Sequence, residues 1–166
     1  MKKFVLFTLA LTFGVLTVQS QGRFQAGGHL GLPVGDAGDL ATFAIALDLA
    51  YILEINDNIS AGPAIGYSHS FGDEIDTGLG SIEIDDVQFL PIGGRAQFNI
   101  TDQFLARAEL GYALGINDGN DGGFYFSPQV GYSVSDGLDI IAAYRSVSVD
   151  GGSWDMITAG ISFWID

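Results

Sequence analysis

Apolar side chains alternate with small or polar side chains along most of this sequence. In the closing stretch ITAGISFWID, the odd-numbered residues from Ile157 to Ile165 are apolar, and the residues between them are mainly small or polar. A period of two residues is typical of a β-strand, because successive side chains point to opposite faces. No stretch after Ser20 has a convincing helical period, so the chain offers no second layer to cover the apolar faces. The fold must supply an apolar environment in another way.

Eight segments of this kind follow one another, separated by turn residues. Tight turns, as at residues 101–103, alternate with longer loops rich in glycine and acidic residues, as at residues 72–85. This arrangement predicts an antiparallel up-and-down meander, with the tight turns at one end and the longer loops at the other. The expected strands are Arg23–Leu32, Thr42–Leu53, Ile59–Phe71, Asp86–Ile100, Phe104–Ile116, Gly123–Val134, Leu138–Val149 and Trp154–Ile165.

Most acidic residues fall in or beside the longer loops. Because these loops lie at the same end of the meander, that end is expected to be strongly acidic and the other end less so. The twelve acidic residues on this side, of 20 in the chain, are Asp36, Asp39, Asp73, Glu74, Asp76, Glu83, Asp85, Asp86, Asp118, Asp121, Asp150 and Asp155.

The first twenty residues have the features of a secretory signal peptide. A basic start, Met1-Lys2-Lys3, precedes a mostly apolar run and the small-residue sequence Val18-Gln19-Ser20. The apolar run is short for a membrane span, and no stop-transfer segment follows it. We expect cleavage after Ser20, so that residues 1–20 are the signal peptide and residues 21–166 form one domain. The alternative is an uncleaved N-terminal anchor.

The charge of the exported part excludes nucleic acid as a partner. Two of the six basic residues are the lysines of the signal peptide, so four arginines remain against 20 acidic residues, a formal charge of −16. A protein surface that binds nucleic acid needs a positive charge. The chain has no cysteine, so no disulfide holds this exported domain together.

The second face of the strands distinguishes a soluble barrel from a membrane barrel. If that face met water, Lys, Glu, Thr and Gln would be common on it, yet it is mostly Gly, Ala and Ser with a few charges. Small residues suit the narrow interior of an eight-stranded barrel. Segments of about 10–13 residues match strands tilted through a bilayer, and closure removes the sheet edges that lipid forbids. The sequence therefore predicts an all-β, eight-stranded antiparallel transmembrane β-barrel whose apolar face meets lipid.

Aromatic residues lie on the predicted lipid-facing side, near the strand ends. Such residues form two girdles at the membrane interfaces of β-barrels. The candidates are Phe24, Phe43, Tyr51, Phe71, Phe98, Phe104, Tyr112, Phe124, Phe126, Tyr132, Tyr144 and Phe163.

Three stretches, VQSQGRF, LPIGGRAQFNI and AGISFWI, carry a resemblance to a known group. The chain resembles the small eight-stranded outer-membrane β-barrels of Gram-negative bacteria, such as the OmpX-like proteins and the OmpA transmembrane domain, and especially the Bacteroidetes-type barrels. The resemblance covers the whole mature chain and implies an outer-membrane location. It also implies recognition of the C-terminal strand by the barrel-assembly machinery. Family members usually end on an aromatic residue, whereas this chain ends Trp164-Ile165-Asp166, so Phe163 or Trp164 would serve as the signal.

Charged residues on the predicted inner face form the candidate site, a lumen charge network. A buried charge must be paired to be tolerated, so arginines and carboxylates on this face are expected to pair inside the barrel. We favour a structural network that fills the lumen, and the alternative is a gated ion path or a proton-linked switch. The network residues are Asp48, Arg95, Arg107, Glu109, Asp139 and Arg145.

Other candidate residues give weaker signals. His29 and His69 lack neighbours with metal-ligand spacing. The stretch YSHS resembles the His and Ser of outer-membrane lipid A deacylases, but His69 and Ser70 are adjacent in a strand and so point to opposite faces. Residues 117–123, NDGNDGG, offer oxygen ligands without the spacing of an EF-hand. We therefore expect no catalytic residue, no bound metal and no cofactor.

These observations favour a structural or interaction protein of the outer membrane. Its expected partners are outer-membrane lipid and lipopolysaccharide, whose phosphates divalent ions would bridge to the acidic loops. We expect a monomer with no enzymatic activity. The alternatives are a narrow channel for small solutes or ions and a lipid A-modifying enzyme.

Overall fold

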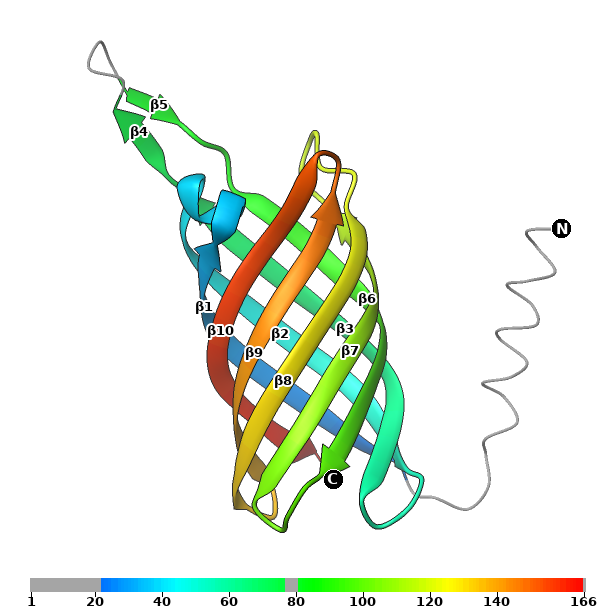
Figure 1. Cartoon of the computed structure of the whole chain (residues 1–166). Helices are drawn as coiled ribbons and strands as arrows, with labels where there is room; N and C mark the ends of the chain where they lie inside the picture. Colours follow the sequence, from blue (N-terminus) through cyan, green and yellow to red (C-terminus); the bar gives the residue numbers. More distant parts are fainter. Residues whose placement is uncertain (1–21, 77–80, 166) are drawn as a thin grey trace, which may run out of the picture.

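Eight long antiparallel strands close into a barrel in the computed structural model, which describes residues 22–76 and 81–165. Around the barrel the order is β1-β10-β9-β8-β7-β6-β3-β2, so neighbours in the long-strand sequence are also neighbours in space (Figure 1). The expected signal peptide, residues 1–20, lies outside the described residues, as does Asp166. The long strands are β1 (Arg23–Val34), β2 (Ala41–Glu54), β3 (Ile59–Gly72), β6 (Val87–Asn99), β7 (Phe104–Gly115), β8 (Gly123–Ser135), β9 (Leu138–Val149) and β10 (Gly152–Ile165).

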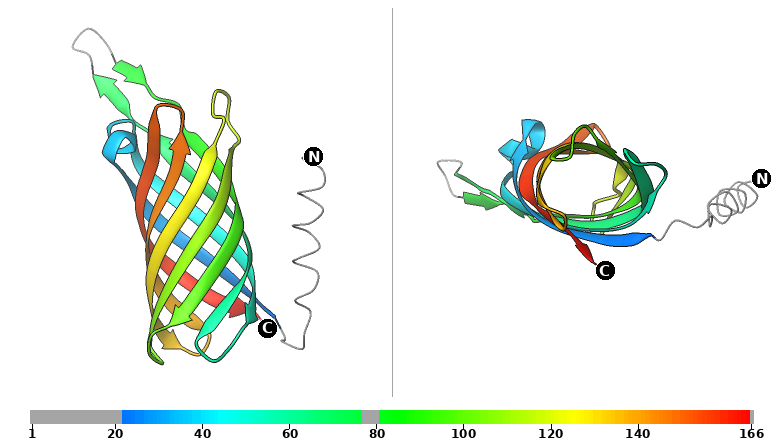
Figure 2. Two further views of the ribbon diagram at one scale, coloured as in Figure 1. Left: turned by 45° about the vertical axis from the view of Figure 1, so that its right-hand side comes forward. Right: turned by 90° about the horizontal axis from the view of Figure 1, so that it is seen from below.

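The first and last strands close the sheet on itself. The register between β1 and β10 runs without a break from Phe24 opposite Ile165 to Val34 opposite Asp155. Viewed along its axis, the barrel forms a continuous ring of strands (Figure 2). This closure confirms the fold expected from the alternating segments, and it leaves no unpaired sheet edge for a membrane to meet.

The two ends of the barrel differ, as the lengths of the connections predicted. We call the end with the tight turns, residues 55–58, 100–103 and 136–137, the turn end, and the opposite end the loop end. At the loop end, the 3₁₀ helix η1 (Gly35–Asp39) joins β1 to β2. A hairpin of β4 (Glu74–Asp76) and β5 (Ser81–Glu83) stands clear of the barrel between β3 and β6 (Figure 1).

The alternation along the strands separates two surfaces, as expected. Large apolar side chains point outward, among them Leu30, which is 62% exposed, and Val130, which is 63% exposed. Charged and polar side chains point inward, and Arg145 is only 1% exposed. A soluble barrel would have the reverse arrangement, because its apolar side chains would form the core. The outer surface is therefore suited to lipid and the inner surface to polar contacts.

Two groups of aromatic side chains lie on the outer surface. At the turn end, the ring centroids of Phe24 and Tyr51 lie 5.0 Å apart. At the loop end, the rings of Phe43 and Phe71 stack at 5.9 Å. Both groups lie near strand ends, where the girdles of a membrane barrel meet the interfaces.

The interior of the loop end is apolar. Phe89, Val147, Trp154 and Met156 are buried in one cluster, and η1 adds Ala37, which is fully buried. The indole Nε1 of Trp154 donates a hydrogen bond to the Ser70 hydroxyl at 3.0 Å, so the polar atom of the ring is satisfied. We call this cluster the apolar lid, because its packed side chains lie beneath the loops.

No helix within the described ranges has the length and apolarity of a membrane-spanning helix.

Candidate functional site: the charged barrel lumen

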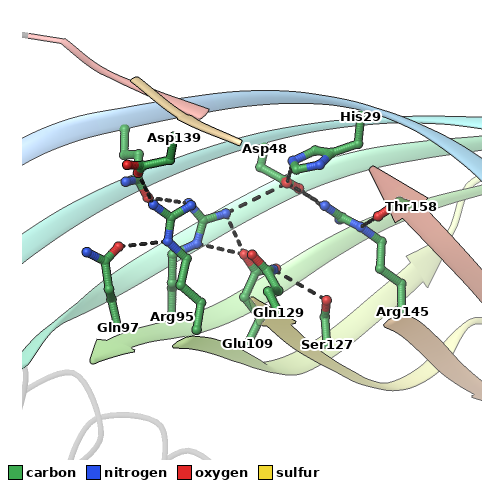
Figure 3. Close-up of polar contacts among 12 residues, drawn as sticks. His29, Asp48, Arg95, Gln97, Glu109, Ser127, Gln129, Asp139, Arg145 and Thr158 are labelled. Carbon is green, nitrogen blue, oxygen red and sulfur yellow. Dashed lines mark hydrogen bonds and ion pairs between the residues drawn. The ribbon is translucent and has the colours of Figure 1, made fainter. Parts of the chain in front are cut away.

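The six residues of the predicted charge network all lie inside the barrel. They come from β2, β6, β7 and β9, and each belongs to the inward-facing row of its strand. Each is at most 7% exposed. Figure 3 shows five of these side chains in the lumen: Asp48, Arg95, Glu109, Asp139 and Arg145.

Asp48 is the centre of the first group of contacts. Arg145 reaches it from the far side of the barrel, with Nη1 and Nη2 lying 3.0 and 2.6 Å from the two carboxylate oxygens. The Nε2 atom of His29 lies 2.9 Å from Asp48 Oδ2. Arg95 approaches the same oxygen at 3.8 Å. A carboxylate that forms a bidentate pair with one guanidinium has a fixed orientation as well as a partner for its charge.

Glu109 extends this group toward β6 and β8. Arg95 and Glu109 face each other in register on neighbouring strands, and Arg95 Nε lies 2.7 Å from the carboxylate. The hydroxyl of Tyr125 donates to the other oxygen of Glu109 at 3.1 Å. Arg145 in turn donates to the Tyr125 oxygen at 3.3 Å, which links the two carboxylates through one phenol. Gln25 accepts a hydrogen bond from Arg95 at 2.7 Å.

Arg107 and Asp139 form a second group, closer to the turn end. Arg107 Nη2 lies 2.5 Å from Asp139, and its Nε donates to the Gln97 side chain at 2.7 Å. The Ser133 hydroxyl donates to the other oxygen of Asp139 at 2.7 Å. Both oxygens of this buried carboxylate are thus satisfied.

The charges of the network balance. Three arginines face three carboxylates, and each arginine contacts at least one carboxylate. Buried ions are tolerated only when they are paired and hydrogen-bonded, and this arrangement meets both conditions. Three positive and three negative groups give these six residues no net charge when all are ionised. The network is thus a set of mutually paired ions inside the barrel.

Sequence reasoning identified the charged members but missed their neutral partners. Gln25, Gln97 and Tyr125 share the inward-facing rows, so the period of two was the available signal for them. The pairing of Arg145 with Asp48 joins residues 97 apart in the chain. That contact crosses the lumen between two strands that are not neighbours in the sheet, so it depends on the cross-section of the closed barrel. Alternation along a single strand does not specify that cross-section.

A vestibule of about 630 Å³ opens at the turn end. Asp139 and Gln97 of the second group lie at its inner boundary, while Asp57, Asp102 and Asp136 belong to the three turns around it. Arg23 lies over the ring of Trp164, with its guanidinium carbon 5.1 Å from the ring centroid.

His69 and Ser70 of the YSHS stretch point to opposite faces, as expected. Ser70 is buried in the lumen and accepts the hydrogen bond from Trp154. His69 points outward, and its Nε2 lies 2.8 Å from Asp86. A nucleophile and a base must be within mutual reach, so this pair does not form a catalytic site.

In the loop with the sequence NDGNDGG, residues 117–123, asparagine side chains form hydrogen bonds that hold the loop in place. Asn117 accepts hydrogen bonds from the Gln88 backbone and from Asn120, and Asn120 also contacts Gly122. Among the side chains that the structure describes, no group of three or more His, Cys, Asp or Glu residues is arranged to hold a metal ion.

No protein-family model matches the chain, and the search of curated proteins finds no match. Solved structures do share its fold. The attachment invasion locus protein Ail of Yersinia pestis, in complex with the heparin analogue sucrose octasulfate, has a TM-score of 0.60 at 13% identity, over 89% of this chain and 100% of that chain. Ail in a phospholipid bilayer nanodisc has a TM-score of 0.59 at 14% identity, over 87% and 100%.

A designed protein has the same architecture. A de novo transmembrane β-barrel has a TM-score of 0.52 at 12% identity, over 89% of this chain and 98% of that chain. At such low identity these likenesses establish the fold alone. The chain therefore has the fold of the small eight-stranded outer-membrane β-barrels, as its alternating sequence predicted.

Proposed function

We propose that the protein is a structural or interaction protein of the bacterial outer membrane, with its loop end outside the cell and its turn end in the periplasm. One observation carries the proposal: large apolar side chains cover the outside of a closed barrel while paired ions fill its inside. This distribution is unfavourable in water and favourable in a bilayer. The strand lengths and the two aromatic groups support the same placement.

In this proposal the lumen is closed by two layers of side chains. The apolar lid, with Phe89 and Trp154, fills the loop end, and the ion network fills the middle. Eight strands leave room for little more than side chains. The vestibule is then a blind pocket that opens only toward the periplasm, and the barrel conducts neither solutes nor ions.

Planar-bilayer recordings test the closed lumen. The wild-type protein is expected to give no conductance steps above background at either polarity. The matched control replaces one large side chain in each layer, Trp154→Gly with Arg145→Gly, and is expected to leak. A heat-dependent shift in gel mobility confirms that both proteins are folded. Regular steps from the wild type would support a narrow channel for small solutes or ions instead.

The acidic loop end is the surface proposed to meet partners. The arginines described in the structure lie in the lumen or at the turn end, so none offsets the loop carboxylates. Divalent cations would bridge these carboxylates to lipopolysaccharide phosphates. An anionic sulfated sugar such as the one bound to Ail would be repelled here, because like charges face each other. Binding to lipopolysaccharide vesicles should therefore require calcium or magnesium and fall after addition of a chelator.

The proposal assigns no enzymatic activity to the protein. Ser70 lies in the lumen, where Trp154 and Met156 surround its hydroxyl, and His69 lies outside. Lipid A from cells that overexpress the protein is expected to keep its acyl pattern, as measured by mass spectrometry. A changed acyl pattern that disappears in the His69→Gln variant would support the lipid A-modifying alternative.

A further inference from the structure

The vestibule at the turn end is a cavity with the dimensions of a ligand site. Its volume of about 630 Å³ lies within the range of about 300–1,000 Å³ that small-molecule sites in proteins occupy. Asp139, which is paired with Arg107, lies at its inner boundary, so the charge network closes the cavity on that side. The space is therefore large enough for an organic molecule and ends within the barrel.

Acidic side chains lie at the rim of the vestibule. Each of the three turns contributes one exposed carboxylate, from Asp57, Asp102 and Asp136. Within the described ranges, none of these three carboxylates forms an ion pair. Arg23 is the one cationic side chain among the described residues that line the cavity, so negative charges are in excess. A ligand with positive charge is therefore favoured here.

The lining suits an extended organic molecule better than a single metal ion. The three carboxylates belong to separate turns, and among the described side chains no three His, Cys, Asp or Glu residues converge to hold a metal. Neutral polar groups, including Asn58, Gln103 and Ser135, also line the cavity and can bind hydroxyl groups as donors and acceptors. Leu105 and Trp164 add apolar surface against which a carbon skeleton can pack. This lining matches a molecule that carries both amines and hydroxyls.

Two buried polar groups beside the vestibule have no hydrogen-bond partner among the described residues. They are Gln25 Nε2 and Ser162 Oγ, whose residues are 0% and 1% exposed. Gln25 is the register partner of Trp164, and Ser162 is the register partner of Asp139, so both lie next to residues that line the cavity. Buried polar atoms are rarely left unpaired, and an amide nitrogen needs an acceptor, which an ammonium group does not supply. A ligand in the vestibule therefore needs oxygen acceptors as well as positive charge.

We propose that the vestibule is a binding site for a basic amino sugar, a saccharide whose amines are protonated. The turn carboxylates receive the ammonium groups in charge-assisted hydrogen bonds, and the neutral polar side chains bind the hydroxyls. Oxygen atoms at the inner end of the sugar accept from Gln25 and pair with Ser162, directly or through one ordered water. This activity lies beyond the structural role proposed above, and the closed lumen makes the vestibule a binding pocket rather than a passage.

The two tryptophans of the chain provide one reporter in the vestibule and one at the opposite end. Trp164 lines the vestibule, whereas Trp154 lies in the apolar lid. The Trp154→Phe variant, folded in detergent micelles, is titrated with a linear trimer of glucosamine, and its fluorescence is expected to change saturably. The matched control Trp164→Phe, which keeps only Trp154, is expected to show no such change. Micelles leave both ends accessible, so the result does not depend on the orientation in the membrane.

Two further probes separate the contribution of charge from that of the hydroxyl groups. The N-acetylated trimer has the same skeleton without the positive charges, and it is expected to bind at least about fivefold more weakly, because each exposed ion pair adds a modest amount. Spermidine carries amines without hydroxyls and is also expected to bind more weakly, because it offers no acceptor to Gln25. All titrations are made at the same ionic strength, since salt screens exposed charges.

Substitutions then locate the site. Asp102→Asn combined with Asp136→Asn should weaken binding of the glucosamine trimer about fivefold, because two exposed ion pairs are lost. Ser162→Ala should weaken it about threefold through loss of one hydrogen bond. The matched control, Asp118→Asn with Asp121→Asn, removes two exposed carboxylates at the loop end and should leave the affinity unchanged. Heat-dependent gel mobility shows that each variant is folded before it is titrated.

Three results would overturn the proposal. The first is a Trp164 fluorescence that does not change saturably, or a change of equal size in Trp164→Phe. The second is an equal affinity for the glucosamine trimer and for spermidine, because charge alone would then account for binding. The third is an affinity that the Asp102, Asp136 double variant leaves unchanged, or that the loop-end control lowers to the same extent.

Discussion

At the scale of single residues, stability depends on whether each buried charge keeps its partner. Arg107 contacts Asp139 at 2.5 Å and is 4% exposed. Arg107→Leu should lower the free energy of unfolding by about 3–5 kcal/mol, because it leaves Asp139 as an unpaired buried charge. Urea unfolding in detergent micelles measures the loss. The double variant Arg107→Leu, Asp139→Leu should recover much of it, and equal midpoints for the wild type and Arg107→Leu would show that the pair contributes nothing.

The last residues of β10 include Phe163 and Trp164, the two candidates for the signal that the barrel-assembly machinery is expected to recognise. Phe163 faces outward and is 43% exposed, whereas Trp164 faces inward beneath Arg23. A signal read on the lipid-facing side of the last strand must be Phe163, so Phe163→Ala should slow insertion in cells more than Trp164→Ala does. Pulse-chase labelling, with heat-dependent gel mobility as the readout of folding, compares the two variants. A stronger defect in Trp164→Ala would assign the signal to the inward-facing ring.

At the scale of the strand, the side of the sheet decides which substitutions are tolerated. Ala142 and Ala143 are neighbours on β9, but Ala142 is exposed on the outer face and Ala143 is 4% exposed in the lumen. Ala142→Leu should be tolerated, because it adds apolar surface to the lipid face. Ala143→Leu should destabilise the barrel by about 1–3 kcal/mol through overpacking. Thermal unfolding in the same detergent distinguishes them, and equal effects would mean that β9 has no distinct faces.

The same alternation explains what the sequence could predict. All eight long strands, from β1 to β10, were recognised because a period of two persists over most of each strand. The short elements η1, β4 and β5 were missed, because three to five residues are too few to establish a period. The contact of His69 with Asp86 was also missed, because Asp86 lies in a loop whose path no local pattern fixes.

At the scale of the whole molecule, the orientation in the membrane is open to direct measurement. Ser81 belongs to the loop end and Asp102 to the turn end, and both are exposed. Ser81→Cys should react with a membrane-impermeant maleimide on intact cells, whereas Asp102→Cys should react only after the outer membrane is permeabilised. Because the natural chain has no cysteine, any labelling reports the introduced site. The reverse pattern would invert the proposed topology.

The barrel as a whole depends on lipid in this account, because its apolar residues are on the outside. The most direct test is to dilute urea-unfolded protein, made as residues 21–166, into lipid vesicles and, in parallel, into lipid-free buffer. Circular dichroism and heat-dependent gel mobility then report folding. We predict a folded β-barrel in vesicles and none in buffer. A cooperative, fully folded β-protein in buffer without lipid or detergent would contradict the account.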